Sequence, residues 1–274
     1  MYESVKKMSI IGIDLGSSAT KMINMSEEGQ ILNTLILNRT NAKKAIDFFI
    51  DDKKIDKQKI SKIVLTGVRK NEIEENIYNI DTIKVDEFIA IGTGGLYLSN
   101  KKEGLVVSIG TGTAFVKAEN KNFEHIGGTG IGGGTLLNLC KKIGDISSFN
   151  EINESILKGK LDNIDLTIQD VSMQEIKTLP KDTTSANFGK LNEKATRDDI
   201  IKGIANMIIE TIGMMAVFAT QKEEKKDIIV IGNVATMPYT STVLKKIEKL
   251  HNVKFIIPKY AEFATAIGAI KSVK

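Results

Sequence analysis

The feature that most constrains the fold of this chain is a pattern that occurs twice: an apolar run, a turn of small residues and a second apolar run. The first copy runs from residues 10–13 through the turn 14–18 into 22–25, and the second runs from 105–110 into 114–118. Short apolar runs broken by glycine and polar pairs are typical of strands. We therefore expect two related halves, each opening on strands that meet at a tight turn.

The most glycine-rich segment, residues 125–135 (HIGGTGIGGGT), has six glycines in the eight positions 127–134 and leads into the apolar segment 136–143. Glycine lets backbone N–H groups approach an anion without an intervening Cβ, and a helix N-terminus adds the positive end of its dipole. With the turns at 14–18 and 109–113, this segment predicts one polyphosphate held from several sides.

The rest of the chain alternates between strand-like and helix-like patterns, which predicts an α/β fold with ligands at the carboxyl ends of strands. Thr196 is the expected N-cap of the longest helix. The charged loop 100–103 is the expected lobe boundary, which gives an N-terminal lobe over 1–104 and a C-terminal lobe over 105–274. Further strands are expected at 31–37, 62–65, 82–85, 227–231 and 253–257, and helices at 42–50, 72–78, 86–99, 135–143, 149–158, 197–220 and 262–272.

Composition narrows the class of protein. The 274 residues are 42% hydrophobic and 26% charged, and the net charge of +4 comes from 38 basic and 34 acidic residues spread along the whole length. We expect a solvated surface with no nucleic-acid partner. No apolar run approaches a membrane span, and residues 1–8 lack the apolar core of a signal peptide. Cys140 has no internal disulfide partner, which fits a buried, inert thiol in a cytoplasmic protein.

Two common nucleotide motifs do not explain the glycines. Residues 128–133 match GxGxxG, but the following segment predicts more helix and not the second parallel strand of a dinucleotide-binding unit. Neither Gly159–Lys160 nor Gly189–Lys190 is followed by Ser or Thr, so the chain has no P-loop sequence. A nucleotide held between two lobes remains as the interpretation.

Phosphoryl transfer between two lobes requires metal-bridged phosphates and a carboxylate that orients the attacking hydroxyl. Asp14, which ends a strand before a glycine turn, is placed to hold the water shell of Mg²⁺ or to form an Asx turn. Lys21 would neutralise phosphate charge or lie in solvent. Glu87 is the candidate base, although an acid in the first turn of a helix is also favoured by the dipole. His125 would bind a substrate carboxylate or cap a strand.

Taken together, these segments resemble the type II pantothenate kinases of the actin/hexokinase/Hsp70 superfamily, over nearly the whole chain. The resemblance rests on IGIDLGSSATKM, on VDEF around Glu87, on IGTGT, on HIGGTGIGGGT, on TSANFGK at 184–190, on VIGNV at 230–234 and on FATAIGAI near the C-terminus. It implies a two-lobed, ribonuclease H-like fold with duplicated mixed sheets flanked by helices and an ATP cleft between the lobes.

The resemblance also implies the roles of individual residues. Glu87 would be the catalytic carboxylate, and Asp14 would bind Mg²⁺ through water. His125 and Glu87 would meet the substrate. The residues implied to contact ATP are Asp14, Gly16, Ser17, Ser18, Lys21, Thr111, Gly112, Thr113, Gly133, Gly134, Thr135, Leu136, Leu137 and Asn233.

The implied reaction is phosphorylation of pantothenate by ATP to 4′-phosphopantothenate, on the route to coenzyme A, by a homodimer. The chain departs from the family pattern at three positions, with His125 for arginine, Ile89 for an acid and Ser108 for asparagine. Because imidazole lacks the permanent charge and donor fork of guanidinium, a pantetheine-like acceptor or another hydroxylated small molecule is an alternative.

Two rival functions use the same fold. One is an ATPase switch like the activators that bind an iron–sulfur cluster between subunits, for which a single Cys140 supplies poor ligands. The other is a protein that senses a nucleotide or an acyl-CoA without turnover. The helix at 197–220, with Met207, Met214, Met215 and Phe218, offers the apolar surface on which a dimer would form.

Overall fold

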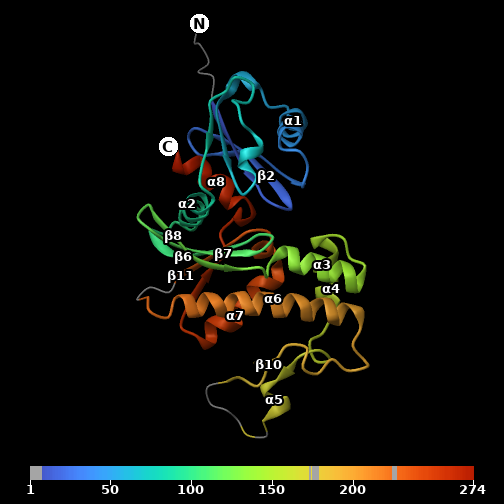
Figure 1. Cartoon of the computed structure of the whole chain (residues 1–274). Coiled ribbons are helices and arrows are strands. Elements are labelled where there is room, and N and C mark those ends of the chain that lie inside the picture. The colour runs from blue at the N-terminus through green and yellow to red at the C-terminus, as the bar shows by residue number, and fades with distance from the viewer. Residues whose placement is uncertain (1–7, 173, 175–178, 224–226) are drawn as a thin grey trace.

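A computed structural model describes residues 8–172, 174, 179–223 and 227–274, and it contains two five-stranded mixed sheets (Figure 1). The first sheet has the order β3-β2-β1-β4-β5. Its strands β1, β2 and β3 pair antiparallel, and β1, β4 and β5 pair parallel. The bounds are β1 Ser9–Leu15, β2 Ala19–Ser26, β3 Ile31–Asn38, β4 Ile60–Thr66 and β5 Thr82–Lys84.

The second sheet repeats the first. Read from its other edge, its order is β8-β7-β6-β11-β12, with an antiparallel trio and two parallel additions in the same places. This confirms the duplication expected from the repeated strand-turn-strand pattern. The bounds are β6 Glu103–Ile109, β7 Thr113–Glu119, β8 Asn122–Thr129, β11 Asp227–Ile231 and β12 Lys254–Ile256.

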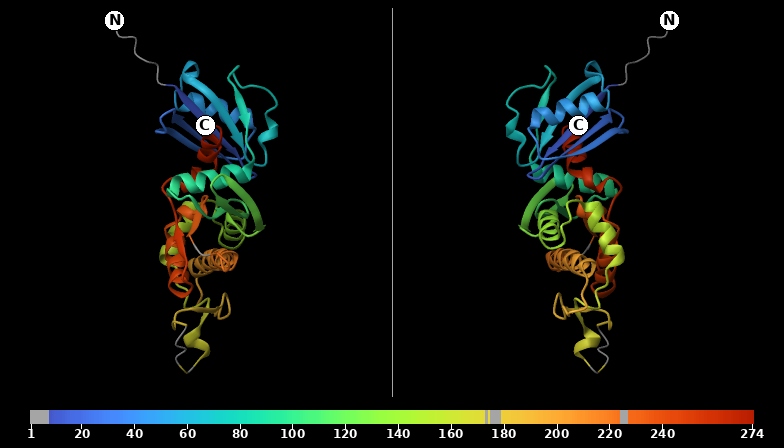
Figure 2. Two further views of the ribbon diagram at one scale, coloured as in Figure 1. Left: turned by 90° about the vertical axis from the view of Figure 1, so that its left-hand side faces the viewer. Right: turned by 90° about the vertical axis from the view of Figure 1, so that its right-hand side faces the viewer.

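Two helices cross between the sheets (Figure 2). Helix α2 (Glu87–Ser99) packs on the second sheet, where a Cβ at Gly95 would meet the Val106 side chain. Helix α8 (Ala264–Ser272) packs on the first sheet, where a Cβ at Gly12 would stand 2.5 Å from the Ala266 carbonyl oxygen. Each half of the chain therefore supplies the helix that covers a sheet of the other half.

The crossing of α2 and α8 depends on glycine. A Cβ at Gly94 would overlap the Ala264 carbonyl, and a Cβ at Gly268 would overlap the Ala90 carbonyl oxygen and stand 2.5 Å from Gly94 N. Without side chains at these two positions, the helix backbones touch directly. The contact joins the halves of the molecule at the point where α2 presents its first residue, Glu87.

The second sheet carries its remaining helices on the face opposite α2. The long helix α6 lies beneath it, with Thr196 as the predicted N-cap accepting a hydrogen bond from Asp199 N at 3.2 Å (Figure 1). Helix α7 was not expected from the sequence, although Pro238 begins it in the favoured first position. The bounds are α3 Gly133–Gly144, α4 Phe149–Lys158, α6 Arg197–Ala219 and α7 Pro238–Leu250, and in the first half α1 Ala42–Asp52.

Helix α6 requires a correction to the expectation about apolar runs. Among the described residues it is the one helix long and apolar enough to cross a membrane by length and composition, with a mean hydropathy of 1.6. However, 61% of that apolar window is buried inside the protein. Its side chains Ile209, Ile212 and Ala216 belong to the same core as Val107 and Val230 of the sheet. The helix therefore has the packing of a core helix.

The helix expected at 72–78 is wrong. The structure has only a short 3₁₀ turn, Lys70–Glu72, followed by irregular chain in which Tyr78 and Asn79 adopt left-handed backbone angles. Ile73 and Ile77 are both buried against the core of the first sheet, so their four-residue spacing reflects burial and not helical hydrogen bonding. Over so short a segment, a helical spacing of apolar residues does not distinguish a helix from an irregular segment with buried side chains.

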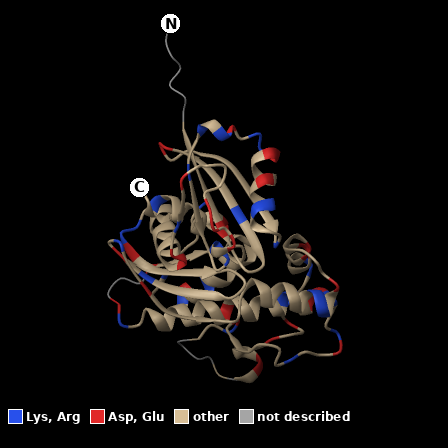
Figure 3. Ribbon diagram, turned by 45° about the horizontal axis from the view of Figure 1, so that its top comes forward, with Lys and Arg blue, Asp and Glu red and all other residues tan. Residues whose placement is uncertain are grey.

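Two smaller features complete the fold. A hairpin of β9 (Leu166–Thr167) and β10 (Thr184–Ala186), with the short helix α5 (Ile168–Val171), protrudes beyond α6 (Figures 1 and 2). Basic and acidic residues alternate over the ribbon (Figure 3). The basic pair at 225–226 and most of the N-terminal segment 1–8 lie outside the described residues.

Candidate active site

A cleft of about 600 Å³ opens where the two sheets and the two crossing helices meet. It lies at the carboxyl ends of β1 and β6, as expected for an α/β fold. Most of the predicted site residues line it, although they come from five separate parts of the chain. Those that line the cleft are Asp14, Gly16, Ser17, Ser18, Lys21, Glu87, Thr111, Gly112, Thr113, Gly133, Gly134, Leu137 and Asn233.

The two strand-connecting turns face each other across this cleft. The Ser17 hydroxyl donates to Thr111 Oγ1 at 2.9 Å, and the Ser18 and Thr111 hydroxyls lie 2.8 Å apart. Ser17 and Ser18 follow β1, whereas Thr111 follows β6. Three hydroxyl groups from equivalent turns of the two halves therefore gather at one point, where they can donate to the oxygens of a bound phosphate.

The glycine-rich segment is built differently from the expected loop. Residues 122–129, including His125, belong to the edge strand β8, and only 130–132 form the turn before α3. The N–H groups of Gly133 and Gly134 donate to the carbonyls of Gly110 and Thr111 at 2.8 and 2.9 Å. The expectation that these N–H groups form a phosphate cradle is therefore wrong in this respect, because their hydrogen bonds join α3 to the second turn.

Close packing explains the glycines at the start of α3. A Cβ at Gly132 would stand 2.7 Å from the Thr111 and Gly112 carbonyl oxygens, and one at Gly134 would stand 2.7 Å from the Thr111 side chain. The helix consequently sits directly on the turn that carries Thr111. The glycines position this turn and leave the end of the helix open to the cleft.

Two predicted ATP contacts lie outside the cleft lining. Leu136 is completely buried in the core of the second half. The Thr135 hydroxyl closes the turn before α3, since it donates to Gly130 O at 3.0 Å and accepts from Gly132 N at 3.3 Å. Side chains on successive positions of a helix point in different directions. Leu137 faces the cleft for this reason, while its neighbour Leu136 faces the core.

A charged pair forms the floor of the cleft. Asp14 on β1 and Lys21 on β2 are register partners, so both side chains lie on one face of the sheet, and both are buried. Burial raises the pKa of the Asp14 carboxyl, and the charge of Lys21 opposes this rise. Burial lowers the pKa of Lys21, and Asp14, Glu262 and Glu87 oppose that shift. The pair therefore forms a fixed polar centre in a water-poor environment.

Glu87 lies on the wall above this pair, as the first residue of α2. The Asp86 carboxylate caps the helix by accepting from Phe88 N at 2.8 Å, which fixes the direction of the first turn. Glu87 is half-buried, and burial together with the negative charge of Asp14 raises the pKa of its carboxyl. A carboxylate with a raised pKa is better matched to accepting a proton at neutral pH.

His125 and Ile89 are outside the cleft lining. The imidazole of His125 stacks on the ring of Phe88, with centroids 4.1 Å apart and planes inclined by 9°. Phe88 is the residue next to Glu87, and a Cβ at Gly128, which lines the cleft, would stand 3.7 Å from His125 Nε2. His125 therefore lies beside the cleft at the Glu87 end, while Ile89 is exposed on the outer face of α2.

Asn233 also lines the cleft. It follows β11, and its side-chain oxygen is buried without a hydrogen-bond partner among the described residues. Some lining residues were not predicted as site residues and reach the cleft through the fold. Among them are Val68 after β4, Ile91 on α2, Asn138 on α3, Phe149 at the start of α4 and Thr265 on α8.

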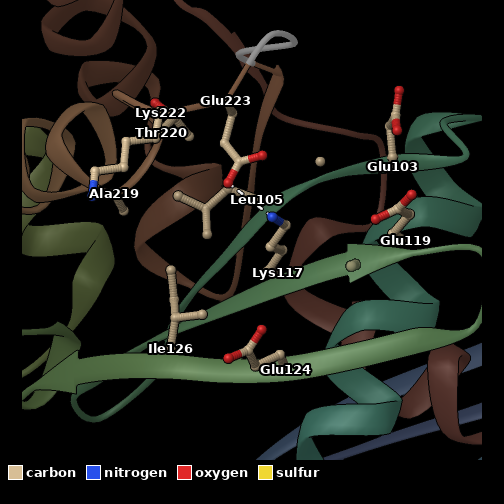
Figure 4. A pocket seen from close by; sticks show the side chains of 12 residues that line it. Glu103, Leu105, Lys117, Glu119, Glu124, Ile126, Ala219, Thr220, Lys222 and Glu223 are labelled. Atoms are coloured by element: carbon tan, nitrogen blue, oxygen red, sulfur yellow. Dashed lines mark hydrogen bonds and ion pairs between the residues drawn. The ribbon is translucent and has the colours of Figure 1, made fainter.

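A second cavity of about 560 Å³ lies on the opposite face of the second sheet, beyond the end of α6 (Figure 4). Lys117 reaches across it to Glu223, with Nζ and Oε1 2.8 Å apart. Its apolar floor includes Leu105 and Ile126. None of the predicted site residues lines it, so the candidate active site is the cleft between the sheets.

Three solved structures share the fold. The (R)-2-hydroxyglutaryl-CoA dehydratase component A of Acidaminococcus fermentans gives a TM-score of 0.68 at 18% identity, covering 97% of this chain and all of that one. The activator of the 2-hydroxyisocaproyl-CoA dehydratase from Clostridium difficile, with bound ADPNP, gives 0.65 at 18%, covering 96% and 92%. A ROK family glucokinase from Streptomyces griseus, in complex with glucose and AMPPNP, gives 0.63 at 12%, covering 96% and 98%. The expected α/β fold with duplicated mixed sheets flanked by helices is thereby confirmed.

Sequence comparison confirms the resemblance to type II pantothenate kinases. The enzymes of that name from Staphylococcus epidermidis RP62A and Staphylococcus aureus USA300 are each 26% identical over 273 residues, 95% of this chain and 98% of each relative. The Fumble family model matches residues 103–272, which is more than half of the chain. This chain therefore belongs to the Fumble family.

Proposed function

We propose that this protein is a pantothenate kinase that transfers the γ-phosphoryl group of ATP to the primary hydroxyl of pantothenate, giving 4′-phosphopantothenate for coenzyme A synthesis. The observation that carries the proposal is the cleft whose lining brings Glu87 together with Asp14, Lys21 and both turns. Similarity to type II pantothenate kinases over 95% of the chain supports the choice of reaction.

The phosphates of ATP would lie between the two turns, where the Ser17, Ser18 and Thr111 hydroxyls meet. The buried ammonium of Lys21 would offset their charge. Asn233, which lines the same cleft, would lie near the base or ribose. Donors and a cation placed around the transferring group in a water-poor cleft are the main requirement of phosphoryl transfer.

The residues at the cleft floor suit Mg²⁺ bound mainly by phosphates and water. Mg²⁺ keeps several waters and is usually bound through one or two carboxylates and the substrate phosphates. Asp14 supplies one buried carboxylate, and among the described residues no cluster of three metal-ligating side chains competes for the ion. When bound there, Mg²⁺ would neutralise phosphate charge, and Asp14 would hold one of its waters.

Glu87 would orient the acceptor hydroxyl and take its proton during transfer. Its place at the start of a capped helix fixes the backbone that carries it, and its raised pKa favours proton transfer. The stacked His125 and Phe88 rings would form the neighbouring wall of the acceptor site. Since a stacked imidazole is not a permanent charge, a pantetheine-like acceptor without the carboxylate is the second substrate to test.

Glu87→Gln provides the decisive test, because it keeps the size and polarity of the side chain and removes the base. We expect the phosphorylation rate to fall by about 10² to 10⁴-fold, while calorimetry shows unchanged ATP binding. Labelled ATP with pantothenate, pantetheine and sugars identifies the acceptor. Absence of transfer to every hydroxyl acceptor by the unmodified protein would refute the kinase proposal.

The rival ATPase switch with a shared iron–sulfur cluster is not favoured. The single cysteine, Cys140, is completely buried inside the second half, so it is not placed to ligate a cluster between subunits. A sensor that binds a nucleotide without turnover is also not favoured, because the cleft places a candidate base, Glu87, among the residues that would bind ATP.

We also propose a cytoplasmic homodimer. Met207, Met214, Met215 and Phe218 lie along one partly exposed side of α6, and Phe218 is 60% exposed. Burial of this side against its copy would remove apolar surface from water. Light scattering should give twice the 30.0 kDa chain mass, and Phe218→Glu should give the monomer.

A further inference from the structure

Thr66 is the last residue of β4 and the register partner of Asp14 on the adjacent parallel strand β1. Register partners on neighbouring strands are about 4.8 Å apart and point to the same face. Lys21, Asp14 and Thr66 therefore form one row across three strands, on the face covered by α8. Asp14 and Lys21 line the cleft, whereas Thr66 lies behind them.

The Thr66 hydroxyl is unusual for a core group. The residue is fully buried, and its Oγ1 has no hydrogen-bond partner within the described part of the chain. A buried hydroxyl without a partner destabilises the fold, so a valine of nearly the same shape would serve the core better. Such a group calls for an explanation, which can be a bound water, strain or a role in a nearby site.

The chain after Thr66 encloses the Asp14 carboxylate. Gly67 has a φ of +90°, and a Cβ there would stand 2.7 Å from Asp14 Oδ1 and 2.6 Å from the Leu15 carbonyl oxygen. Arg69 N donates to this same Leu15 carbonyl at 3.0 Å. The end of β4 is thus fastened around the end of β1, and Thr66 is the polar side chain that this arrangement holds beside Asp14.

We propose that Thr66 is a positioning residue for Asp14. When the site binds MgATP, the Thr66 hydroxyl donates a hydrogen bond to the Asp14 carboxylate. This fixes one carboxylate oxygen and leaves the other directed at a water of the metal. Partners behind a ligating group commonly tune metal affinity by 10 to 100-fold. The inference rests on the proposed role of Asp14 in holding hydrated Mg²⁺.

Thr20 supplies a matched control. It is also fully buried, and its Oγ1 also has no partner among the described residues. Its register partner on β1 is Leu15, so it points to the opposite face of the sheet, toward the core under α1. Thr20→Val and Thr66→Val therefore make the same chemical change on the two faces of one sheet.

The test compares Thr66→Val, Thr66→Ser and Thr20→Val by thermal unfolding and by calorimetric binding of ATP with Mg²⁺ and with EDTA. We expect both valine variants to melt at or above the unmodified temperature. Only Thr66→Val should weaken MgATP binding, by about 10-fold or more, and raise the Mg²⁺ concentration for half-maximal activity. ATP binding in EDTA should be unchanged, and Thr66→Ser should behave as the unmodified protein.

Each outcome decides the inference. If Thr66→Val folds and binds MgATP normally, or weakens ATP binding equally in EDTA, Thr66 does not position Asp14. If Thr66→Val fails to fold, its hydroxyl has a structural partner, which also overturns the inference. If the unmodified protein binds no MgATP, the proposed kinase function fails together with the inference, whereas the first two outcomes leave that function intact.

Discussion

The direct contact between α2 and α8 makes Gly268→Ala the most informative single substitution. The new Cβ would overlap the Ala90 carbonyl oxygen and lie 2.5 Å from Gly94 N, although Cβ atoms essentially never come within 3.0 Å of such atoms. The obstacle is backbone, which cannot rotate away as a side chain does. The two helices must therefore move apart by about 1 Å, a shift of the size that overpacked cores show.

The expected magnitude follows from two opposing effects. Alanine favours a helix interior over glycine by about 1 kcal/mol, whereas overpacking costs about 1–3 kcal/mol and occasionally more. Because the clash is with the backbone of α2, we expect the high end of that range and a net loss of about 2 kcal/mol. At about 2–4 °C per kcal/mol for a chain of this size, the melting temperature should fall by about 4–8 °C.

The same displacement should reach the active site, because Glu87 is the first residue of α2. A misplacement of about 1 Å can cost about 10²-fold in rate, so kcat should fall more than the loss of stability explains at 25 °C. Differential scanning calorimetry and steady-state kinetics on the same preparations measure both effects.

The matched control is Gly213→Ala in α6, also a helix-interior glycine. Its Cβ would meet the side-chain ends of Ile247 at 2.5 Å and Leu244 at 3.1 Å, which can adjust. We expect a change of less than about 1 kcal/mol and normal kcat. If Gly268→Ala is as stable and active as Gly213→Ala, the backbone contact does not join the two halves as described.

Three further predictions concern single side chains. Thr111→Val removes the hydroxyl that bonds to the first turn. In initial-rate assays the KM for ATP should rise about 10-fold, while the variant keeps normal stability. An unchanged KM would exclude a contact between Thr111 and the phosphates. Burial and the charge of Asp14 raise the pKa of the Glu87 carboxyl, and the ionised carboxylate is the base. On acidification, kcat should therefore fall at a pH above the ordinary titration range of glutamate. A pH–rate profile without this acid limb would exclude Glu87 as the base. Burial raises the pKa of the Cys140 thiol to about 12. A disulfide reagent at pH 8 should therefore titrate no thiol in the native protein and one per chain in denaturant. Rapid labelling of the native protein would show that the core around Cys140 opens to solvent.

Local patterns predicted those parts of the fold that bury continuous apolar runs. Strands β1, β2 and β11 are nearly all buried, and β6 and β7 are each buried at four of seven positions, so their sequences differ from the turns around them. The edge strand β8 has only exposed and half-buried residues and contains Gly127 and Gly128. Because glycines also mark turns, this strand was interpreted as part of a loop.

The site divides along similar lines. The turns after β1 and β6 were predictable, because glycine and small polar residues directly after an apolar run are typical of turns. The hydrogen bonds from Gly133 and Gly134 to the second turn depend on how α3 packs, which a local motif does not specify. The same holds for Phe149 and Thr265, which reach the cleft only through the tertiary fold.

The exchange of covering helices also decides how the protein can be divided. A fragment ending at residue 104 would keep the first sheet but lose α8, exposing Ile10, Ile23 and Val64 to water. The complementary fragment would lose α2 from the second sheet in the same way. Neither fragment contains the helix that covers its own sheet, but each contains the helix that covers the sheet of the other. Two co-expressed fragments are therefore suited to reassemble, as a split reporter does.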